Sequence, residues 1–213
     1  MTRPLIPTVA PRLPAARGAY DQSAENEYTR VLYLYFSQLD NITQGLLGRQ
    51  GGKYLNNPYG AFQNDTTQAI TLVNTPYDVV LNTTDYANGM ALASNRITVA
   101  QSGIYNVQFS LQFENTHTSI VNTWVWLRKN GVDVAGTAST WAVVSAHGGI
   151  HGYAIGACNF YLDMAAGDYL ELVVAADDVG INLEAYAAAT SPFTRPSVPS
   201  SVVTVSFVST KPT

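Results

Sequence analysis

The segment at residues 97–114, ITVAQSGIYNVQFSLQFE, constrains the fold of this chain more than any other. It predicts two β-strands joined by a tight turn at Ser102-Gly103. After the turn, a mostly alternating set of positions is apolar: Ile104, Val107, Phe109, Leu111 and Phe113. The other face is polar: Asn106, Gln108, Ser110, Gln112 and Glu114. A period of two with one polar face indicates a strand that is half-buried in an antiparallel sheet.

The composition points to a polar, weakly charged protein. The length of 213 residues fits one or two domains, and charged residues make up only 12% of the chain, about half the usual ~25%. Such a surface suits packing in an assembly. The net charge is −4 without a basic run, so we expect no binding to nucleic acid. No apolar stretch reaches the ~20 residues of a membrane helix, and the N-terminus lacks the apolar region of a signal peptide.

Residues 53–213 are expected to form one all-β domain, because short apolar strands and turn signals follow one another throughout. The Asn130-Gly131 pair predicts a type I′ hairpin, since both residues accept positive φ angles. Further turns are expected at 166–168 and 178–180, and the proline-rich segment 191–199 is expected to be a loop. The expected strands are 68–73, 77–81, 97–99, 104–113, 122–129, 139–145, 152–162, 169–175, 182–188 and 201–208. This series predicts an antiparallel jelly-roll β-sandwich.

Several motifs of this region carry a resemblance to a known superfamily. The pattern G-x-Y-x-V-x-F at Gly103, Tyr105, Val107 and Phe109, with GDYLEL at 167–172, resembles the tumour necrosis factor (TNF) and complement globular-head superfamily. WLRKNG at 126–131, NFYLDMAAGDYLEL at 159–172 and TRPSVPSSVVTV at 194–205 resemble the version found in phage structural proteins. The resemblance implies a TNF-like jelly roll that binds and displays, is not an enzyme, and packs into homotrimers through aromatic-rich sheet faces.

Residues 21–52 are expected to form a helix over 21–47 and a glycine linker that contains Gly48, Gly51 and Gly52. Asp21 or Ser23 can cap the helix, and Glu25 and Glu27 stand in its first turn. Apolar residues recur at heptad spacing: Tyr28, Leu32, Tyr35, Leu39, Ile42 and Leu46. This seam predicts a short coiled coil between copies, and the alternative is that the helix packs on its own sandwich or on capsid subunits.

Residues 1–20 are expected to form an extended arm, because proline at this density prevents a helix. As an anchor on a capsid, the arm would use these residues: Pro4, Pro7, Pro11, Arg12, Pro14 and Arg17. The alternative is a tail without a partner. The stretch PRLPAARGAYDQSAENEYTRVLYLYFSQLDNIT at 11–43 resembles the N-termini of phage virion proteins, which lead into a pattern like LRLYFNQLD. Here Tyr33 replaces the arginine of that pattern.

The sandwich is expected to fold without a cofactor, metal or disulfide around a core of strand-centre residues: Tyr105, Phe109, Leu111, Trp126, Phe160 and Leu172. Cys158 is the single cysteine, and we expect it to be a buried small apolar residue. Trp124 and Trp126 share one strand face and are interpreted as core or subunit interface. Trp141 is the tryptophan expected to be exposed, since it follows the loop AGTAST.

Groups that could carry chemistry are few. Asp177-Asp178 could bind calcium and His147, His151 and His117 could hold a metal between copies, but solvated turn aspartates and exposed imidazoles are the preferred interpretation. The motifs G-x-S-x-G, H-E-x-x-H, Walker A and G-x-G-x-x-G are missing from the sequence. A two-carboxylate glycosidase pair cannot be chosen from the sequence. We therefore expect no enzymatic activity.

These observations together predict a trimeric virion structural protein of a tailed phage, present in the virion and assembled in the host cytoplasm. It would be a capsid decoration or cement protein, or a short head fibre. Its partners would be other copies of itself and the major capsid protein or another virion protein. The alternative is a receptor- or glycan-binding module of a tail fibre or spike, whose partner would be a host surface glycan.

Overall fold

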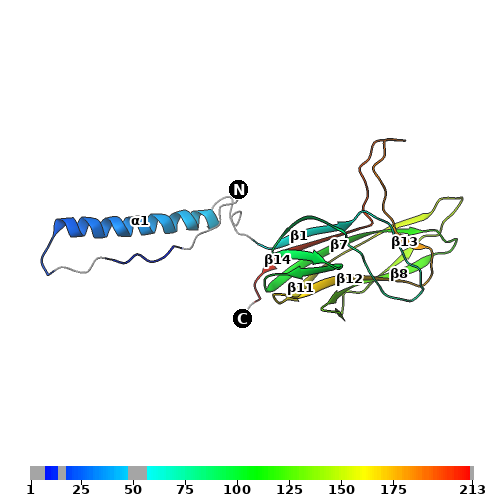
Figure 1. Cartoon of the computed structure of the whole chain (residues 1–213), viewed down its shortest axis with the longest axis horizontal. Coiled ribbons are helices and arrows are strands. Elements are labelled where there is room, and N and C mark those ends of the chain that lie inside the picture. The colour runs from blue at the N-terminus through cyan, green and yellow to red at the C-terminus, as the bar shows by residue number, and fades with distance from the viewer. Residues whose placement is uncertain (1–7, 14–17, 48–56, 212–213) are drawn as a thin grey trace. The chain divides into compact units, whose positions relative to one another are not determined.

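The computed structural model describes residues 8–13, 18–47 and 57–211. The chain divides into two compact units, Met1–Asn56 and Asn57–Thr213 (Figure 1). The second unit is an all-β sandwich, so the predicted fold class, one helix followed by a mostly antiparallel β domain, is confirmed. The boundary lies four residues beyond the predicted start of the sandwich at residue 53.

The first unit contains the helix α1, Gln22–Leu47. Asp21 caps it, because its Oδ1 accepts hydrogen bonds from the backbone N–H of Ser23 at 2.9 Å and of Ala24 at 3.4 Å. This satisfies donors that have no partner in the first turn of a helix. The helix therefore begins where the sequence predicts.

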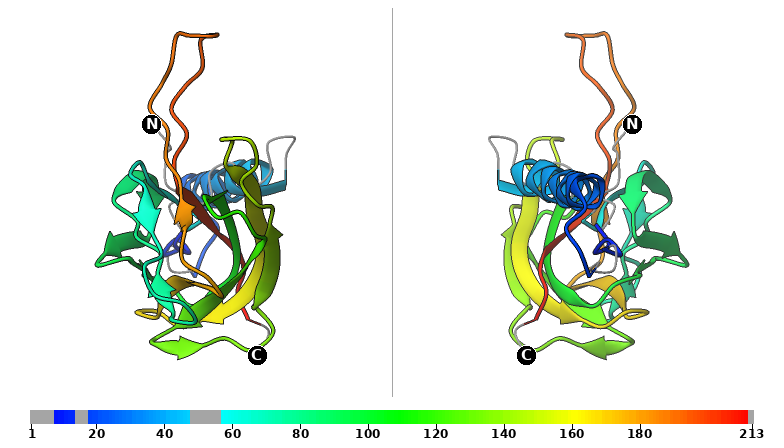
Figure 2. Two further views of the ribbon diagram at one scale, coloured as in Figure 1. Left: turned by 90° about the vertical axis from the view of Figure 1, so that its right-hand side faces the viewer. Right: turned by 90° about the vertical axis from the view of Figure 1, so that its left-hand side faces the viewer.

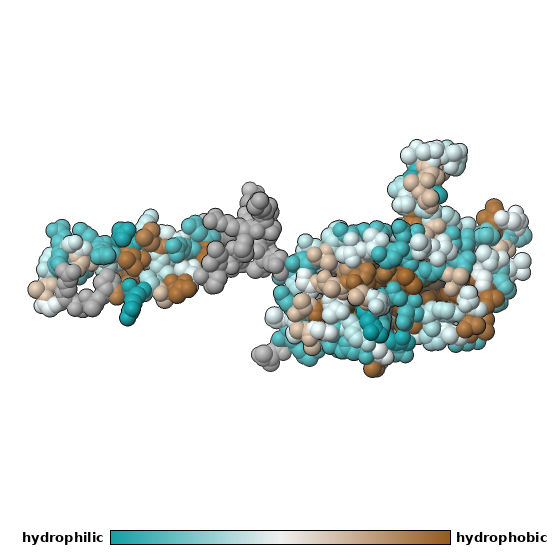
Figure 3. All heavy atoms as spheres, in the orientation of Figure 1, coloured by the Kyte–Doolittle hydropathy of each residue, from teal (hydrophilic) through white to brown (hydrophobic). Residues whose placement is uncertain are grey.

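The predicted seam follows the less exposed side of α1. Leu32, Tyr35, Leu39 and Ile42 are half-buried and Tyr28 is exposed. Figure 3 shows apolar residues beside hydrophilic ones on the helix surface, and the exposed apolar side chains there include Tyr33, Leu34 and Phe36. The side chain of Leu46, the predicted linker and the arm residues Pro4, Pro7, Pro14 and Arg17 lie outside the described residues, whereas Pro11 is half-buried and Arg12 is exposed.

The second unit consists of two antiparallel sheets of seven strands each. The first sheet has the order β2 (Gln68–Ala69), β13 (Ile181–Leu183), β7 (Gly103–Asn115), β14 (Ser201–Ser209), β1 (Tyr59–Asn64) and β4 (Thr83–Asn88), and β11 (Gly152–Met164) pairs with β7. The second has the order β10 (Ser139–Val143), β8 (Val121–Lys129), β12 (Tyr169–Ala176), β6 (Arg96–Val99) and β5 (Met90–Ala93), with β3 (Tyr77–Asp78) on β12 and β9 (Val132–Asp133) on β8.

The strands on either side of Ser102-Gly103 do not pair with each other. β6 lies in the second sheet and β7 in the first, so the turn carries the chain from one layer to the other. The predicted alternation within β7 is confirmed, with Phe109, Leu111 and Phe113 buried. Tyr105 is buried and Ile104 is half-buried, because the strict period of two places Ile104 on the polar face.

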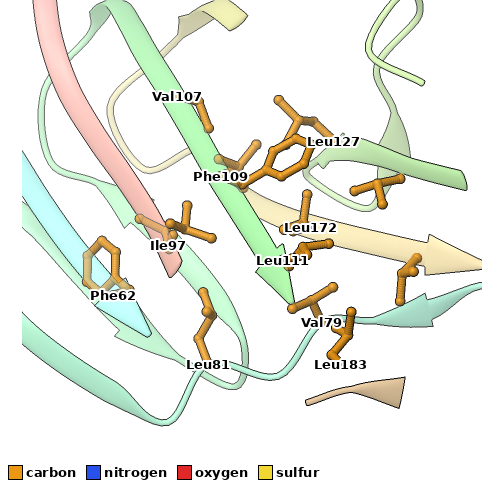
Figure 4. Close-up of a cluster of buried hydrophobic side chains, with 14 of the residues drawn as sticks. Phe62, Val79, Leu81, Ile97, Val107, Phe109, Leu111, Leu127, Leu172 and Leu183 are labelled. Carbon is orange, nitrogen blue, oxygen red and sulfur yellow. The ribbon is translucent and has the colours of Figure 1, made fainter. Parts of the chain in front are cut away.

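The core lies between the two sheets, where apolar side chains from both layers point toward one another (Figure 4). Tyr105, Phe109, Leu111 and Leu172 are buried as predicted, and Phe160 is partly buried against Phe109. The prediction for Trp126 as a core residue is wrong, because Val125 and Leu127 on either side of it are buried and the alternation along β8 turns the half-buried Trp126 to the opposite face.

The opposite correction applies to Trp141, which the sequence predicted to be exposed. Its ring packs against Phe109 and Phe113, with centroid distances of 6.2 and 6.1 Å. Gly156 leaves the room for this packing, since a Cβ there would lie 2.5 Å from the Phe113 ring. Trp141 is thus half-buried and packs against the edge of the core, where β10 approaches β11.

Four of the described strands were not predicted from the sequence: β1, β4, β5 and β9. β1 is buried along most of its length, so it has no alternating pattern, and β4 (TTDYAN) is polar and mostly exposed. The hairpin between β5 and β6 turns at Ser94-Asn95, both with positive φ, without the Asn-Gly signal that correctly predicts the Asn130-Gly131 turn. Within the described ranges, no helix is long and apolar enough to span a membrane.

We predict that Phe109→Ala lowers the free energy of unfolding of the sandwich by about 3–5 kcal/mol, because it removes a ring that touches two other aromatic rings in the core. Denaturant titration followed by tryptophan fluorescence measures this change. Val132→Ala, at an exposed position of β9, serves as the control and is expected to change stability little. An equal effect of the two substitutions would contradict the placement of the core.

Candidate interaction surface

The burial of one face of the first sheet determines which residues lie on its outward face, because side chains alternate along each strand. Residues opposite each other in the ladder share a face, and β11 pairs with β7 along thirteen residues, from Gly152↔Asn115 to Met164↔Gly103. Outward positions of β7 and β11 therefore include the pairs Gln112↔Ile155, Ser110↔Ala157 and Asn106↔Tyr161. On the other side, β14 adds Val202, Thr204 and Ser206 to this face.

This surface exposes large apolar and aromatic side chains. Ile155 is 62% exposed and Tyr161 66%, and Tyr153 also faces solvent. On the far side of the same face, Tyr59 of β1 packs edge-on against Tyr86 of β4, with ring centroids 6.1 Å apart. Tyrosine-rich, charge-poor surfaces are typical of protein interfaces.

β11 is also an edge strand, since β7 is its only partner among the described strands. Edge strands are usually protected by short length, proline or charge. β11 has thirteen residues, no proline, and Asp163 as its single charged residue. An edge of this length and composition favours a contact with another chain.

A shallow hollow lies in the middle of this face. Small and polar residues line it, among them Ser110, Ala157, Asn159, Val202 and Thr204. The larger Ile155 and Tyr161 occupy outward positions of β11 on either side of Ala157 and Asn159. A hollow lined by small residues and bordered by bulky ones can accommodate side chains of a partner protein.

A buried carboxylate stands at one end of the face. Glu114 is only 7% exposed, and its Oε1 lies 2.8 Å from His151 Nδ1. The hydroxyls of Tyr153 and Tyr186 donate to the same oxygen at 3.4 and 3.5 Å, and Asn182 Nδ2 donates to Oε2 at 3.4 Å. We call these residues, with Glu184, the Glu114 cluster.

The surroundings of the two glutamates in the Glu114 cluster shift their pKa values in opposite directions. Burial by itself would raise the pKa of Glu114, but the hydrogen bonds from His151 and Asn182 outweigh it and hold that pKa below its usual range. Burial, together with the nearby Glu114 carboxylate, raises the pKa of Glu184. Burial also raises the pKa of Tyr186, so its hydroxyl remains a donor.

The remaining predicted groups have structural partners. Asp177 accepts hydrogen bonds from the backbone and side-chain nitrogens of Asn122 at 2.8 and 2.7 Å, and Asp178 pairs with His117 at 3.3 Å. The histidines do not form one group: His151 contacts Glu114, whereas His117 contacts Asp178. Among the described residues, no three potential metal ligands gather. Cys158 is half-buried, with Sγ 3.4 Å from Ser139 Oγ.

The outward face of the second sheet carries the other two tryptophans. In the ladder, Trp124 is opposite Ala175 and Trp126 is opposite Val173. Trp126 Nε1 donates to Asp133 at 2.8 Å, and Arg128 bridges Asp133 and Asp78, each at 3.0 Å. Trp124 and Trp126 are thus half-buried members of a polar face, not of the core between the sheets.

Neither the Glu114 cluster nor the exposed apolar side of β11 could be predicted from the sequence. β11 carries apolar residues on both faces, so its periodicity does not say which face meets the core. The cluster joins side chains from β7, β11, β13 and the segment after β13, up to 72 residues apart. No local motif encodes such a group.

Comparison with known proteins supports the fold. No family model matches the sequence, and no curated protein does. Among solved structures, the chain is similar to the structure of Eiger TNF from S. frugiperda, with a TM-score of 0.50 and 14% sequence identity. The match covers 74% of this chain and 96% of that one. The sandwich is a TNF-like jelly roll.

We predict that Glu184→Gln raises the melting temperature at pH 8. The raised pKa of Glu184 gives a contribution to stability that is complete below the usual carboxyl pKa of ~4.3 and is lost as pH rises through the raised value. Glutamine is neutral at every pH, so the variant has neither the cost of burying a second carboxylate nor its repulsion by Glu114. The gain should vanish near pH 4, which thermal melts across this range will show. Glu27→Gln on the exposed helix is the control. A Glu184→Gln variant that is less stable than the wild type at pH 8 would contradict the unfavourable effect of the ionised Glu184 beside Glu114.

Proposed function

We propose that this chain is a non-enzymatic virion structural protein of a tailed phage, a capsid decoration or cement protein or a short head fibre. In this proposal three copies associate through the outward faces of their first sheets and through α1. The arm attaches the trimer to the major capsid protein or another virion protein, and the jelly rolls project from the particle. The resemblance of residues 11–43 to phage N-termini supports the source.

The exposed tyrosine- and isoleucine-rich face of β7, β11 and β14 carries the proposal. Its charged outward groups, Glu114 and Asp163, stand at opposite ends of the β7–β11 ladder. Between these ends, the described outward positions of the three strands carry no charged side chain. A second copy can cover this stretch without burying an unpaired charge, which would be costly.

The contacts of the Glu114 carboxylate support a non-enzymatic role. Its oxygens lie within hydrogen-bond distance of His151, Tyr153, Tyr186 and Asn182. Burial and these neighbours leave Glu114 a structural partner for the residues around it.

We predict a homotrimer in solution, measured as a mass of about three chains by multi-angle light scattering at micromolar concentration. Introducing charge into the face through the double substitution Ile155→Arg and Tyr161→Arg should shift the mass toward one chain. Val132→Arg, on the other sheet, is the matched control and should remain trimeric. A wild-type mass of one chain would overturn the proposed trimer. A double variant that remains trimeric would show that this face is not the trimer interface.

We also predict that residues 1–20 serve attachment and not the folding of the sandwich. Deleting them should leave the melting temperature of the sandwich nearly unchanged, because the sandwich is a separate compact unit. The same deletion should abolish incorporation into particles, scored by mixing purified protein with virions that lack it. Normal decoration by the shortened chain would place the anchor elsewhere.

A second candidate function is glycan or receptor binding, which the outward tryptophans of the second sheet favour. Trp124 and Trp126 stand two residues apart on one face, and Asp133 fixes the indole of Trp126. Aromatic rings bordered by carboxylates and an arginine can stack on a sugar and hydrogen-bond its hydroxyls. A glycan array with the wild type and Trp124→Ala tests this candidate. Binding that the substitution abolishes would support it, and an array without signal would count against it.

A further inference from the structure

The segment between β13 and β14 forms a narrow ribbon that stands away from the sandwich. Figures 1 and 2 show it projecting from the body of the domain. We call residues 185–199 the projecting ribbon. Its two arms are joined by reciprocal backbone hydrogen bonds between Tyr186 and Val198, at 2.9 and 2.8 Å, and between Ala189 and Arg195, at 3.1 and 2.9 Å.

Side chains stiffen the ribbon along its length. Arg195 Nη1 donates to the carbonyl oxygen of Ala187 at 3.1 Å, and its guanidinium lies 5.6 Å from the centroid of the Tyr186 ring. Arg195 is the one charged residue between positions 185 and 199. Its charge is thus held against the ribbon itself, and the remainder of the ribbon is neutral.

The base of the ribbon is anchored to the first sheet. The backbone N–H of Glu184 donates to the Gln112 carbonyl at 2.8 Å, and that of Ala185 donates to Thr67 Oγ1 at 3.2 Å. The Tyr186 hydroxyl reaches Glu114 on the outward face. These contacts define the direction in which the ribbon leaves the domain.

The tip of the ribbon has no cover within the described chain. Residues 190–194 are all exposed, and Phe193 at the tip is 64% exposed. An aromatic ring that stays exposed at the end of a projection does not contribute the favourable free energy that its burial would give. Such a ring suits insertion into another protein surface, because aromatic anchors dominate interface energies.

We propose that the projecting ribbon packs against a neighbouring copy of this chain in the trimer, with Phe193 buried against that copy. This inference rests on the proposed homotrimer. Tyr186, Arg195 and Val198 at the base of the ribbon line the same hollow as Tyr153 and Ile155 of the outward face. A copy that covers this face therefore meets the ribbon. Figure 1 shows the ribbon running across the strand direction and away from the body of the sandwich.

Photocrosslinking tests this contact. Phe193 is replaced by benzoyl-phenylalanine in the full chain, and copies labelled with ¹⁵N are mixed with separately produced unlabelled copies, unfolded and refolded together. Irradiation should produce crosslinked peptides that combine one labelled and one unlabelled chain, in a preparation whose mass is three chains. The same analogue at Val132, an exposed position of the other sheet, should produce none.

The outcomes separate the two proposals. A mass of one chain overturns the proposed trimer and the ribbon contact with it. A trimeric preparation in which position 193 crosslinks no more than position 132 overturns the ribbon contact alone. Crosslinking of position 193 to a capsid or host protein, but not to a second copy, assigns the ribbon a different partner and also overturns it.

A substitution provides an independent measurement. Phe193→Ser should weaken trimer association at least about tenfold, as expected for an aromatic anchor, measured by dilution in mass photometry. The melting temperature of the sandwich at dilutions where the chain is monomeric should not change, because Phe193 is exposed on the single chain. Val132→Ser is the matched control. Unchanged association of Phe193→Ser would contradict the contact.

Discussion

The structure depends on the burial of one face of β7. This strand pairs with β11 on one side and with β14 and β13 on the other, and its inward side chains form the centre of the core. Because side chains alternate along a strand, burying Phe109 and Leu111 turns Gln108, Ser110 and Gln112 outward. The ladder then places Ile155 and Tyr161 on the same outward surface. The exposed apolar face is therefore a direct consequence of how the core is packed.

The sequence was sufficient for the parts of the fold whose signals are local. The alternation in β7, the Asp21 cap and the Asn130-Gly131 turn each depend on a few neighbouring residues, and each is present in the structure. The two tryptophan predictions failed because they depend on which face of a strand meets the core. Trp126 and Trp141 stand in strands of the same sheet, and only the packing of Phe109 and Phe113 against Trp141 decides between them.

The candidate surface illustrates the same limit. β11 is apolar on both sides, so its outward residues cannot be separated from its inward ones without knowing its partner. The Glu114 cluster depends on side chains brought together by the sheet and by the base of the projecting ribbon. Through Tyr153 and Tyr186, it links the end of the outward face to the base of that ribbon. The low charge of the chain, 12% of residues, is compatible with the proposed contact between copies.

A cryo-electron microscopy reconstruction of the purified full-length chain tests the central claim most directly. The account predicts three sandwiches whose β7–β11–β14 faces meet, with Ile155 and Tyr161 buried between copies. A reconstruction in which copies associate and these two side chains still face solvent would contradict it.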